Sequence, residues 1–166
     1  MATYTSFDPR EAFRQNLGTE HYDDDGKLTY CITVTDEDGQ TVYIPIYLSE
    51  EIKTEELPCL PCMEMYIPPG GTTYEPHDVA ASTRKMESFI KIYIWFTDTD
   101  NIDVTTFAKL IKDQLHNLVR NNQSSTTGIT FMNIEDDGLN SETKGRQVLF
   151  HYEATLYCLY YDLCQD

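Results

Sequence analysis

The first residues that could do chemistry are a cysteine pair, Cys59-Leu60-Pro61-Cys62. A redox pair with this spacing is expected at a helix N-terminus after a strand, where the helix dipole lowers the thiol pKa. This pair instead lies among prolines and precedes a predicted strand. A zinc site needs four ligands, and Cys158 and Cys164 do not form a second pair with suitable spacing. The sequence therefore favours structural cysteines here.

The remaining polar clusters also have simple structural interpretations. Residues 98–103, Asp-Thr-Asp-Asn-Ile-Asp, resemble a fragment of a calcium loop, but the central Gly and the distal Glu are missing. Asp100 or Asp103 as the N-cap of a following helix explains the segment better. The histidines are scattered, without an evident nucleophile or orienting group: His21, His77, His116 and His151. We therefore expect no catalytic residues, no metal site and no cofactor, and we do not expect an enzyme.

Charge and composition narrow the class of protein. The chain has 166 residues and a net charge of −16, so one domain with a proper core is expected. A duplex-binding surface needs clustered Lys and Arg, which are missing, so direct DNA binding is disfavoured. An acidic surface would repel a passing DNA, although acidity also serves solubility or adaptation to salt. Without an apolar run of about 20 residues or a signal pattern, we expect a cytoplasmic protein with no membrane contact and free thiols.

The elements that must position these residues centre on a strand over residues 86–97. Its even positions are apolar except for Ser88, which puts one face of the strand in a core. Its odd positions carry Phe89, Tyr93 and Trp95, so its second face is also aromatic. Residues 104–120 follow with apolar residues at helical spacing, which predicts an amphipathic helix.

Other elements are predicted around this strand and helix. Asp8 and Pro9 begin a short helix that ends at Gly18. A hairpin projects near residues 28–48, and Pro45 places its second strand at a sheet edge. The other predicted segments are a strand at 62–67, an irregular Pro/Gly-rich arm near 68–80, a strand at 129–134, an acidic loop at 135–146 and a final strand at 147–161.

These segments predict a fold class. We expect a single α+β domain over residues 1–166, with a mixed, mainly antiparallel sheet of about five strands. The sheet would pack on one long amphipathic helix plus the short N-terminal helix.

The aromatic residues on the second sheet face indicate an interface. Tyr157 and Tyr161 on the last strand repeat the pattern of Phe89, Tyr93 and Trp95, and large exposed apolar patches mark contact surfaces. The alternative is that a second helix, for example the N-terminal one, covers this face within the chain.

The order of elements resembles that of a known family. The segments that carry the resemblance are Leu57-Pro58-Cys59-Leu60-Pro61, Ile92-Tyr93-Ile94-Trp95-Phe96, the helix at 104–120 and the strand at 147–160. This pattern resembles the tail terminator proteins (tail-completion, or head-to-tail joining, proteins) of long-tailed phages and related archaeal viruses. The resemblance covers most of the chain from about Leu57 onward, plus the first helix.

The resemblance implies a structural role in the virion. It implies a sheet flanked by helices and a homo-oligomeric ring of six subunits, with no catalytic residues. The ring would cap the tail tube protein, stop elongation and dock to the head connector or neck protein, while genomic DNA passes through without specific binding. Assembly would take place in the host cytoplasm, and the final location would be the tail or neck of the virion.

Site residues follow from this resemblance and from the residue patterns together. The interface with a neighbouring subunit or the tube would use Phe89, Tyr93, Trp95, Tyr157, Tyr161, Pro68, Pro69 and Tyr74. The residues that would face the lumen and repel DNA are Asp36, Glu37, Asp38, Glu135, Asp136 and Asp137. The alternatives are another neck, head-completion or tail-tube protein and, from a different class, a small cytoplasmic enzyme or metal-binding domain using Cys59 and Cys62.

Overall fold

The computed structural model describes residues 3–4, 8–52, 57–76, 83–98, 103–123, 129–144 and 147–165. In these residues, nine strands form one mixed sheet, accompanied by two α-helices and one short 3-10 helix. The elements are β1 (Thr3–Tyr4), α1 (Pro9–Leu17), β2 (Thr19–Tyr22), β3 (Leu28–Thr35), β4 (Thr41–Leu48), η1 (Ser49–Glu51), β5 (Cys62–Tyr66), β6 (Thr72–Pro76), β7 (Thr83–Thr97), α2 (Val104–Asn121), β8 (Ile129–Lys144) and β9 (Gln147–Gln165).

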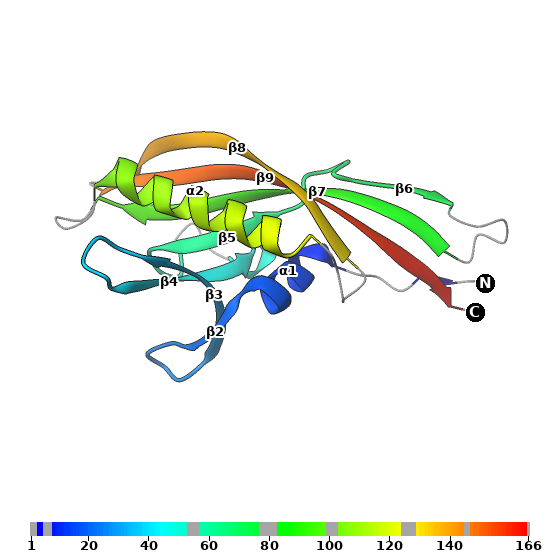
Figure 1. The fold of residues 1–166 in the computed structure, drawn as a ribbon, viewed down its shortest axis with the longest axis horizontal. Coiled ribbons are helices and arrows are strands. Elements are labelled where there is room, and N and C mark those ends of the chain that lie inside the picture. Colours follow the sequence, from blue (N-terminus) through cyan, green and yellow to red (C-terminus); the bar gives the residue numbers. More distant parts are fainter. Residues whose placement is uncertain are drawn as a thin grey trace.

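The sheet is built around β7 and β9, which pair antiparallel along the whole of β7. The strand order is β1-β9-β7-β5-β4-β3-β2, with β6 added beside β7 and β8 beside β9. Among the described strands, only β4 and β5 pair in parallel. In Figure 1, α2 lies across the inner side of the curved sheet, while β6, the start of β7 and the end of β9 extend beyond the helices toward both termini.

The predicted fold class is wrong, because the molecule is mostly sheet, with nine strands instead of about five. The largest difference is β8, which continues through residues 135–144, where an acidic loop was predicted. A strand at a sheet edge faces solvent on several sides, so polar residues do not prevent it from pairing. The polar strand β2 was missed for the same reason, although it pairs with β3.

The prediction that Pro45 places its strand at a sheet edge is wrong, because β4 lies between β3 and β5 in the interior of the sheet. Pro45 lies opposite Cys31 of β3, and the parallel ladder between β4 and β5 begins only at Ile46. The missing N–H of Pro45 therefore lies before the ladder with β5 starts. A proline at the end of a ladder is compatible with an interior strand.

The even-numbered residues of β7 form the core, as the alternation predicts. Ile90, Ile92 and Ile94 are fully buried. Ser88 is also buried, and its hydroxyl lies 2.9 Å from that of Thr72. Burial with a hydrogen-bond partner explains why a polar residue is tolerated at this position.

Both helices pack on this same face of the sheet, which is called the inner face below. Phe13 of α1 meets Phe131 of β8 edge to face, with ring centroids 5.5 Å apart. Phe107 of α2 meets Phe96 of β7 at 4.9 Å. Within the described residues, neither helix covers the opposite, outer face of β7.

The predicted helix termini are confirmed. Asp8 caps α1 and accepts a hydrogen bond from the backbone N–H of Arg10, and Gly18 follows the last turn. Asp103 caps α2 by accepting from the N–H of Thr106, whereas the alternative cap Asp100 lies outside the described residues. These caps satisfy N–H groups that have no partner within a helix.

Candidate functional site: the outer face of the sheet

The outer face is defined here by the odd-numbered residues of β7 and the residues of β9 opposite them. The register pairs Phe89 with Tyr157, Lys91 with Thr155, Tyr93 with Glu153 and Trp95 with His151. Side chains of adjacent strands in such pairs lie side by side. The strand pairing therefore brings together four of the predicted interface residues: Phe89, Tyr93, Trp95 and Tyr157.

An aromatic cluster occupies the part of this face nearest β5. The ring centroids of Trp95 and His151 are 4.6 Å apart, and Tyr93 lies 6.5 Å from Trp95 and 6.0 Å from His151. All three side chains are partly accessible to solvent. Rings at these separations interact favourably and present a rigid apolar surface.

The aromatic surface also extends onto β4 and β5, whose tyrosines were not among the predicted interface residues. Tyr66 of β5 pairs with Lys91, and Tyr47 of β4 pairs with Glu64 of β5. Tyr43 lies on the same side of β4, and both Tyr43 and Tyr66 are more than one-third exposed. The alternation of tyrosines in β4 was the signal that could have identified this extension.

A polar network lies beside the aromatic cluster. The Lys91 ammonium donates to the Thr155 hydroxyl at 2.9 Å, and that hydroxyl donates to Asp137 at 2.5 Å. Lys91 also forms an ion pair with Asp137 at 3.4 Å. Because Thr155 is almost fully buried, these contacts satisfy polar groups that would otherwise be costly to bury.

Glu153 and Glu135 continue the polar network on either side. Glu153 hydrogen-bonds the His151 ring at 2.8 Å, and the Tyr157 hydroxyl donates to Glu135 at 3.3 Å. Burial, together with the negative charge of Glu153, raises the pKa of Tyr93. The shift therefore extends the pH range over which the Tyr93 hydroxyl stays neutral, beyond the ordinary tyrosine value of about 10.

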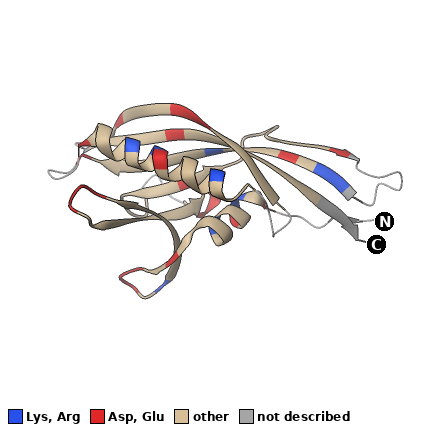
Figure 2. Cartoon of the chain, viewed as in Figure 1, with Lys and Arg blue, Asp and Glu red and all other residues tan. Residues whose placement is uncertain are grey.

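The predicted lumen-facing carboxylates lie in two separate places (Figure 2). Asp36, Glu37 and Asp38 form the turn between β3 and β4, where the Asp36 carboxylate accepts backbone hydrogen bonds from Asp38 and Gln40. Glu135, Asp136 and Asp137 lie instead on β8.

Two of the carboxylates on β8 are paired with lysines. Asp137 meets Lys91, and Asp136 lies 3.0 Å from Lys112 of α2. Burial opposes ionisation of Asp136, but the hydrogen bond and positive charge of Lys112, together with hydrogen bonds from neighbouring groups, outweigh it and lower the pKa of Asp136. The pairing with lysines reduces the negative charge that this part of β8 presents.

The predicted arm is partly ordered as a strand. Pro68 and Pro69 begin a turn in which the Gly71 N–H donates to the Pro68 carbonyl oxygen at 2.8 Å. β6 then pairs with β7, so the prediction of irregular structure is wrong for Thr72–Pro76. Tyr74 is 64% exposed and lies under the Arg84 guanidinium, 4.8 Å from its ring centroid. Residues 77–80 of the predicted arm lie outside the described residues.

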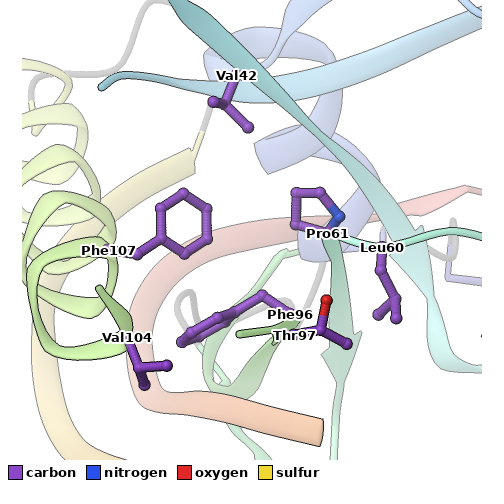
Figure 3. Close-up of a pocket in the computed structure, with 7 residues that line it drawn as sticks. All are labelled: Val42, Leu60, Pro61, Phe96, Thr97, Val104 and Phe107. Atoms are coloured by element: carbon purple, nitrogen blue, oxygen red, sulfur yellow. The ribbon is translucent and has the colours of Figure 1, made fainter. Parts of the chain in front are cut away.

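A small apolar pocket of about 80 Å³ opens where β7 ends and α2 begins (Figure 3). Its walls come from β4, the turn before β5, the end of β7 and the first turns of α2. The lining residues are Val42, Leu60, Pro61, Phe96, Thr97, Val104 and Phe107. Leu60 and Pro61 are the two residues between Cys59 and Cys62, so the cysteine turn forms one wall of this pocket.

The cysteine pair lies at the end of the outer face. Cys62 is the first residue of β5, pairs with Trp95 and is fully buried, whereas Cys59 is partly exposed. The Cys59 sulfur lies 4.0 Å from the Tyr47 hydroxyl. A hydrogen bond from the Cys62 thiol lowers the pKa of Cys59 to about 7; partial burial opposes this shift and Tyr47 adds to it.

Two comparisons with known proteins found no relative. No protein-family model matches the chain, and no curated protein matches it.

In the described residues, no group of three or more His, Cys, Asp or Glu side chains is arranged to hold a metal ion. Neither described helix has the length and apolar character needed to cross a membrane.

Proposed function

We propose that this protein is a structural component of a viral tail that assembles into a ring, in the manner of a tail terminator. The ring would cap the tail tube, stop its elongation and join it to the head connector. The proposal rests on the outer face of β7 and β9, which would bury its aromatic residues against a neighbouring subunit.

The observation that carries the proposal is the concentration of aromatic side chains on a sheet face that no described helix covers. Trp95, Tyr93 and Tyr66 present apolar surface there, while both helices pack on the inner face. Tyrosine and tryptophan are enriched at protein interfaces because each combines a large apolar ring with a polar group. A surface of this composition favours association with a protein over exposure to water.

The overall charge supports the same role. With a net charge of −16, the surface repels the DNA backbone, which suits a channel through which DNA must slide without binding. The exposed acidic turn between β3 and β4 is the strongest candidate for a lumen position. On β8 the carboxylates of Asp136 and Asp137 are paired with lysines, which leaves Glu135 as the weaker candidate.

The test compares two adjacent residues of β7 that lie on opposite faces. Trp95→Glu places a charge on the outer face, and Ile94→Glu places one in the core, where Ile94 is fully buried. We expect the native protein to sediment as a hexamer, or as a monomer that assembles on purified tail tubes. Trp95→Glu should abolish assembly yet retain a cooperative thermal transition, whereas Ile94→Glu should unfold the monomer.

A second outer-face variant covers the case in which Trp95→Glu does not fold. Tyr66→Glu changes a side chain that is 38% exposed and lies opposite Lys91. A strict monomer that does not bind tail tubes would contradict the proposal, as would normal assembly of both outer-face variants.

A further inference from the structure

The turn from Cys59 to Cys62 has the geometry of a reactive thiol beside a second thiol. Cys59 is partly exposed in the turn that precedes β5, and Cys62 is buried at the first position of that strand. The Cys59 sulfur lies 3.6 Å from the Pro61 carbonyl oxygen within the turn and 4.0 Å from the Tyr47 hydroxyl. A partly exposed thiol next to a second thiol two residues further along is the arrangement used for disulfide exchange.

The sequence argued against reactivity because no helix begins at this pair. In the folded protein, the Tyr47 hydroxyl and the Cys62 thiol stabilise a Cys59 thiolate in place of a helix dipole. Tyr47 comes from β4, whose parallel pairing with β5 brings it near the turn. This contact joins residues that are distant in the sequence, so the spacing of the cysteines alone does not reveal it.

We propose that Cys59 and Cys62 form a reversible dithiol–disulfide couple, in which Cys59 attacks a low-molecular-weight disulfide and Cys62 resolves the mixed disulfide. The proposal stands independently of ring assembly, because it rests only on contacts within one chain.

The reaction balances as a two-step exchange. The Cys59 thiolate attacks one sulfur of the small disulfide, forms a mixed disulfide and releases one thiolate, which takes a proton from water. The Cys62 thiol then loses its proton to solvent and attacks the Cys59 sulfur, releasing the second small thiolate. Two protein thiols are oxidised, and one external disulfide is reduced to two thiols.

The contacts around Cys62 explain the order of the two steps. In the reduced protein, the hydrogen bond to Cys59, the burial of the thiol and the negative charge of the Cys59 thiolate raise the pKa of Cys62. A mixed disulfide on Cys59 removes the thiolate and its charge, so Cys62 then ionises more readily. Cys59 is therefore the attacking residue and Cys62 the resolving one.

The other described cysteines are poorly placed to replace either residue. Cys31 is fully buried on β3, and its sulfur lies 3.5 Å from the Thr29 hydroxyl. Cys158 is fully buried on β9, where burial raises its pKa to about 12. Cys158 is therefore a suitable control thiol.

The experiment exposes the folded protein to glutathione disulfide over a series of redox ratios, in a Cys164→Ser background. Acid quenching, alkylation and peptide mass analysis then assign each thiol. We expect the parent protein to lose two hydrogens, with Cys59 and Cys62 both protected from alkylation. The Cys62→Ser variant should instead gain one glutathione, bound to Cys59. The Cys59→Ser variant should gain no glutathione, and its mass should not change. Cys158→Ser should behave as the parent does.

Two observations test the proposal: whether the mixed disulfide on Cys59 persists, and which cysteine finally pairs with Cys59. A mixed disulfide that persists on the parent protein would overturn the resolving role of Cys62, and a Cys31–Cys59 disulfide would do the same. Equal protection of Cys59 and Cys158 would overturn the proposal entirely. Circular dichroism of each variant verifies that the fold is intact.

Two further measurements follow the same couple without mass analysis. Trp95 is the single tryptophan and lies opposite Cys62, so its fluorescence should fall on oxidation in the parent protein but not in Cys59→Ser. The alkylation rate of Cys59 should be half-maximal near pH 7. In Tyr47→Phe the midpoint of this pH dependence should move toward the ordinary thiol pKa of about 8.5. An unchanged midpoint would contradict the role of Tyr47.

The titratable groups around the two thiols are Tyr47 of β4, Cys31 of β3, Glu64 of β5 and Asp23 of the β2–β3 turn.

Discussion

Trp95 of β7 and His151 of β9 are opposite each other in the sheet, with ring centroids 4.6 Å apart. His151 is in turn hydrogen-bonded to Glu153 at 2.8 Å, which fixes the orientation of its ring. The imidazole therefore shields one side of the indole from water. The chain contains one tryptophan, so its fluorescence reports directly on this contact.

Replacing His151 with alanine should expose Trp95. We expect a red shift of the tryptophan emission and more efficient quenching by acrylamide, because water gains access to the indole. His21→Ala is a matched control, since His21 stacks on Tyr43 at 3.9 Å on the β2–β3–β4 part of the sheet. Identical spectra for the native protein and His151→Ala would show that the contact does not protect Trp95 in solution.

Replacing Ile92 with alanine should destabilise the protein strongly. Ile92 is fully buried on the inner face of β7, and truncating such a side chain costs about 2 to 5 kcal/mol through lost burial and the resulting cavity. Urea denaturation of the native protein and the variant measures this difference. Val148→Ala is the control, because Val148 is 47% exposed and its truncation should change stability by less than about 0.5 kcal/mol. Similar losses in both variants would contradict the assignment of the core.

Replacing Asp8 with alanine should weaken α1 in a pH-dependent way. The loss of an N-cap costs about 1 kcal/mol, and the carboxylate also forms an ion pair with Arg10 at 2.8 Å. Partial burial opposes ionisation of Asp8, but hydrogen bonds from the side chain and backbone of Arg10 lower its pKa below the usual value of 3.8.

The pH dependence of this effect has a defined sign. Because the pKa of Asp8 is lower in the folded protein, its carboxylate stabilises the fold above the unfolded-state pKa of about 3.9. That contribution is lost as the pH falls through the folded-state pKa. The difference in stability between the native protein and Asp8→Ala should therefore be largest near neutral pH and shrink below about pH 4. Thermal unfolding of both proteins at a series of pH values measures this difference. A difference that stays constant with pH would contradict the explanation.

Replacing Gly138 with alanine should destabilise β8 through the backbone alone. Gly138 has a φ of 108° and follows the bulge after Asp136. An added Cβ would meet no atom within 4 Å, so steric crowding by neighbouring residues is not involved. A side chain at a positive φ costs about 1 kcal/mol or more. Asn140→Ala on the same strand is the control, and chemical denaturation showing equal stability of the two variants would contradict the prediction.

The sequence alone determined the parts of the fold in which neighbouring residues carry the signal. The alternation in β7 predicted its buried face, because successive side chains of a strand point to opposite sides. Asp8 and Gly18 marked the termini of α1, and the start of α2 was narrowed to Asp100 or Asp103, because capping depends on residues within one turn. The aromatic side chains opposite the core of β7 were also evident from this alternation.

Only the tertiary structure decided how many strands join the sheet and which residues meet on it. The polar residues 135–144 pair with β9 because this long neighbouring strand supplies their hydrogen-bond partners. The local sequence of residues 135–144 does not indicate that such a strand lies beside them. In the same way, the pairing of β4 with β5 brings Tyr47 to Cys59, and the pairing of β7 with β9 brings His151 to Trp95. These contacts depend on strand order and register, which long-range pairing sets and local residue spacing does not.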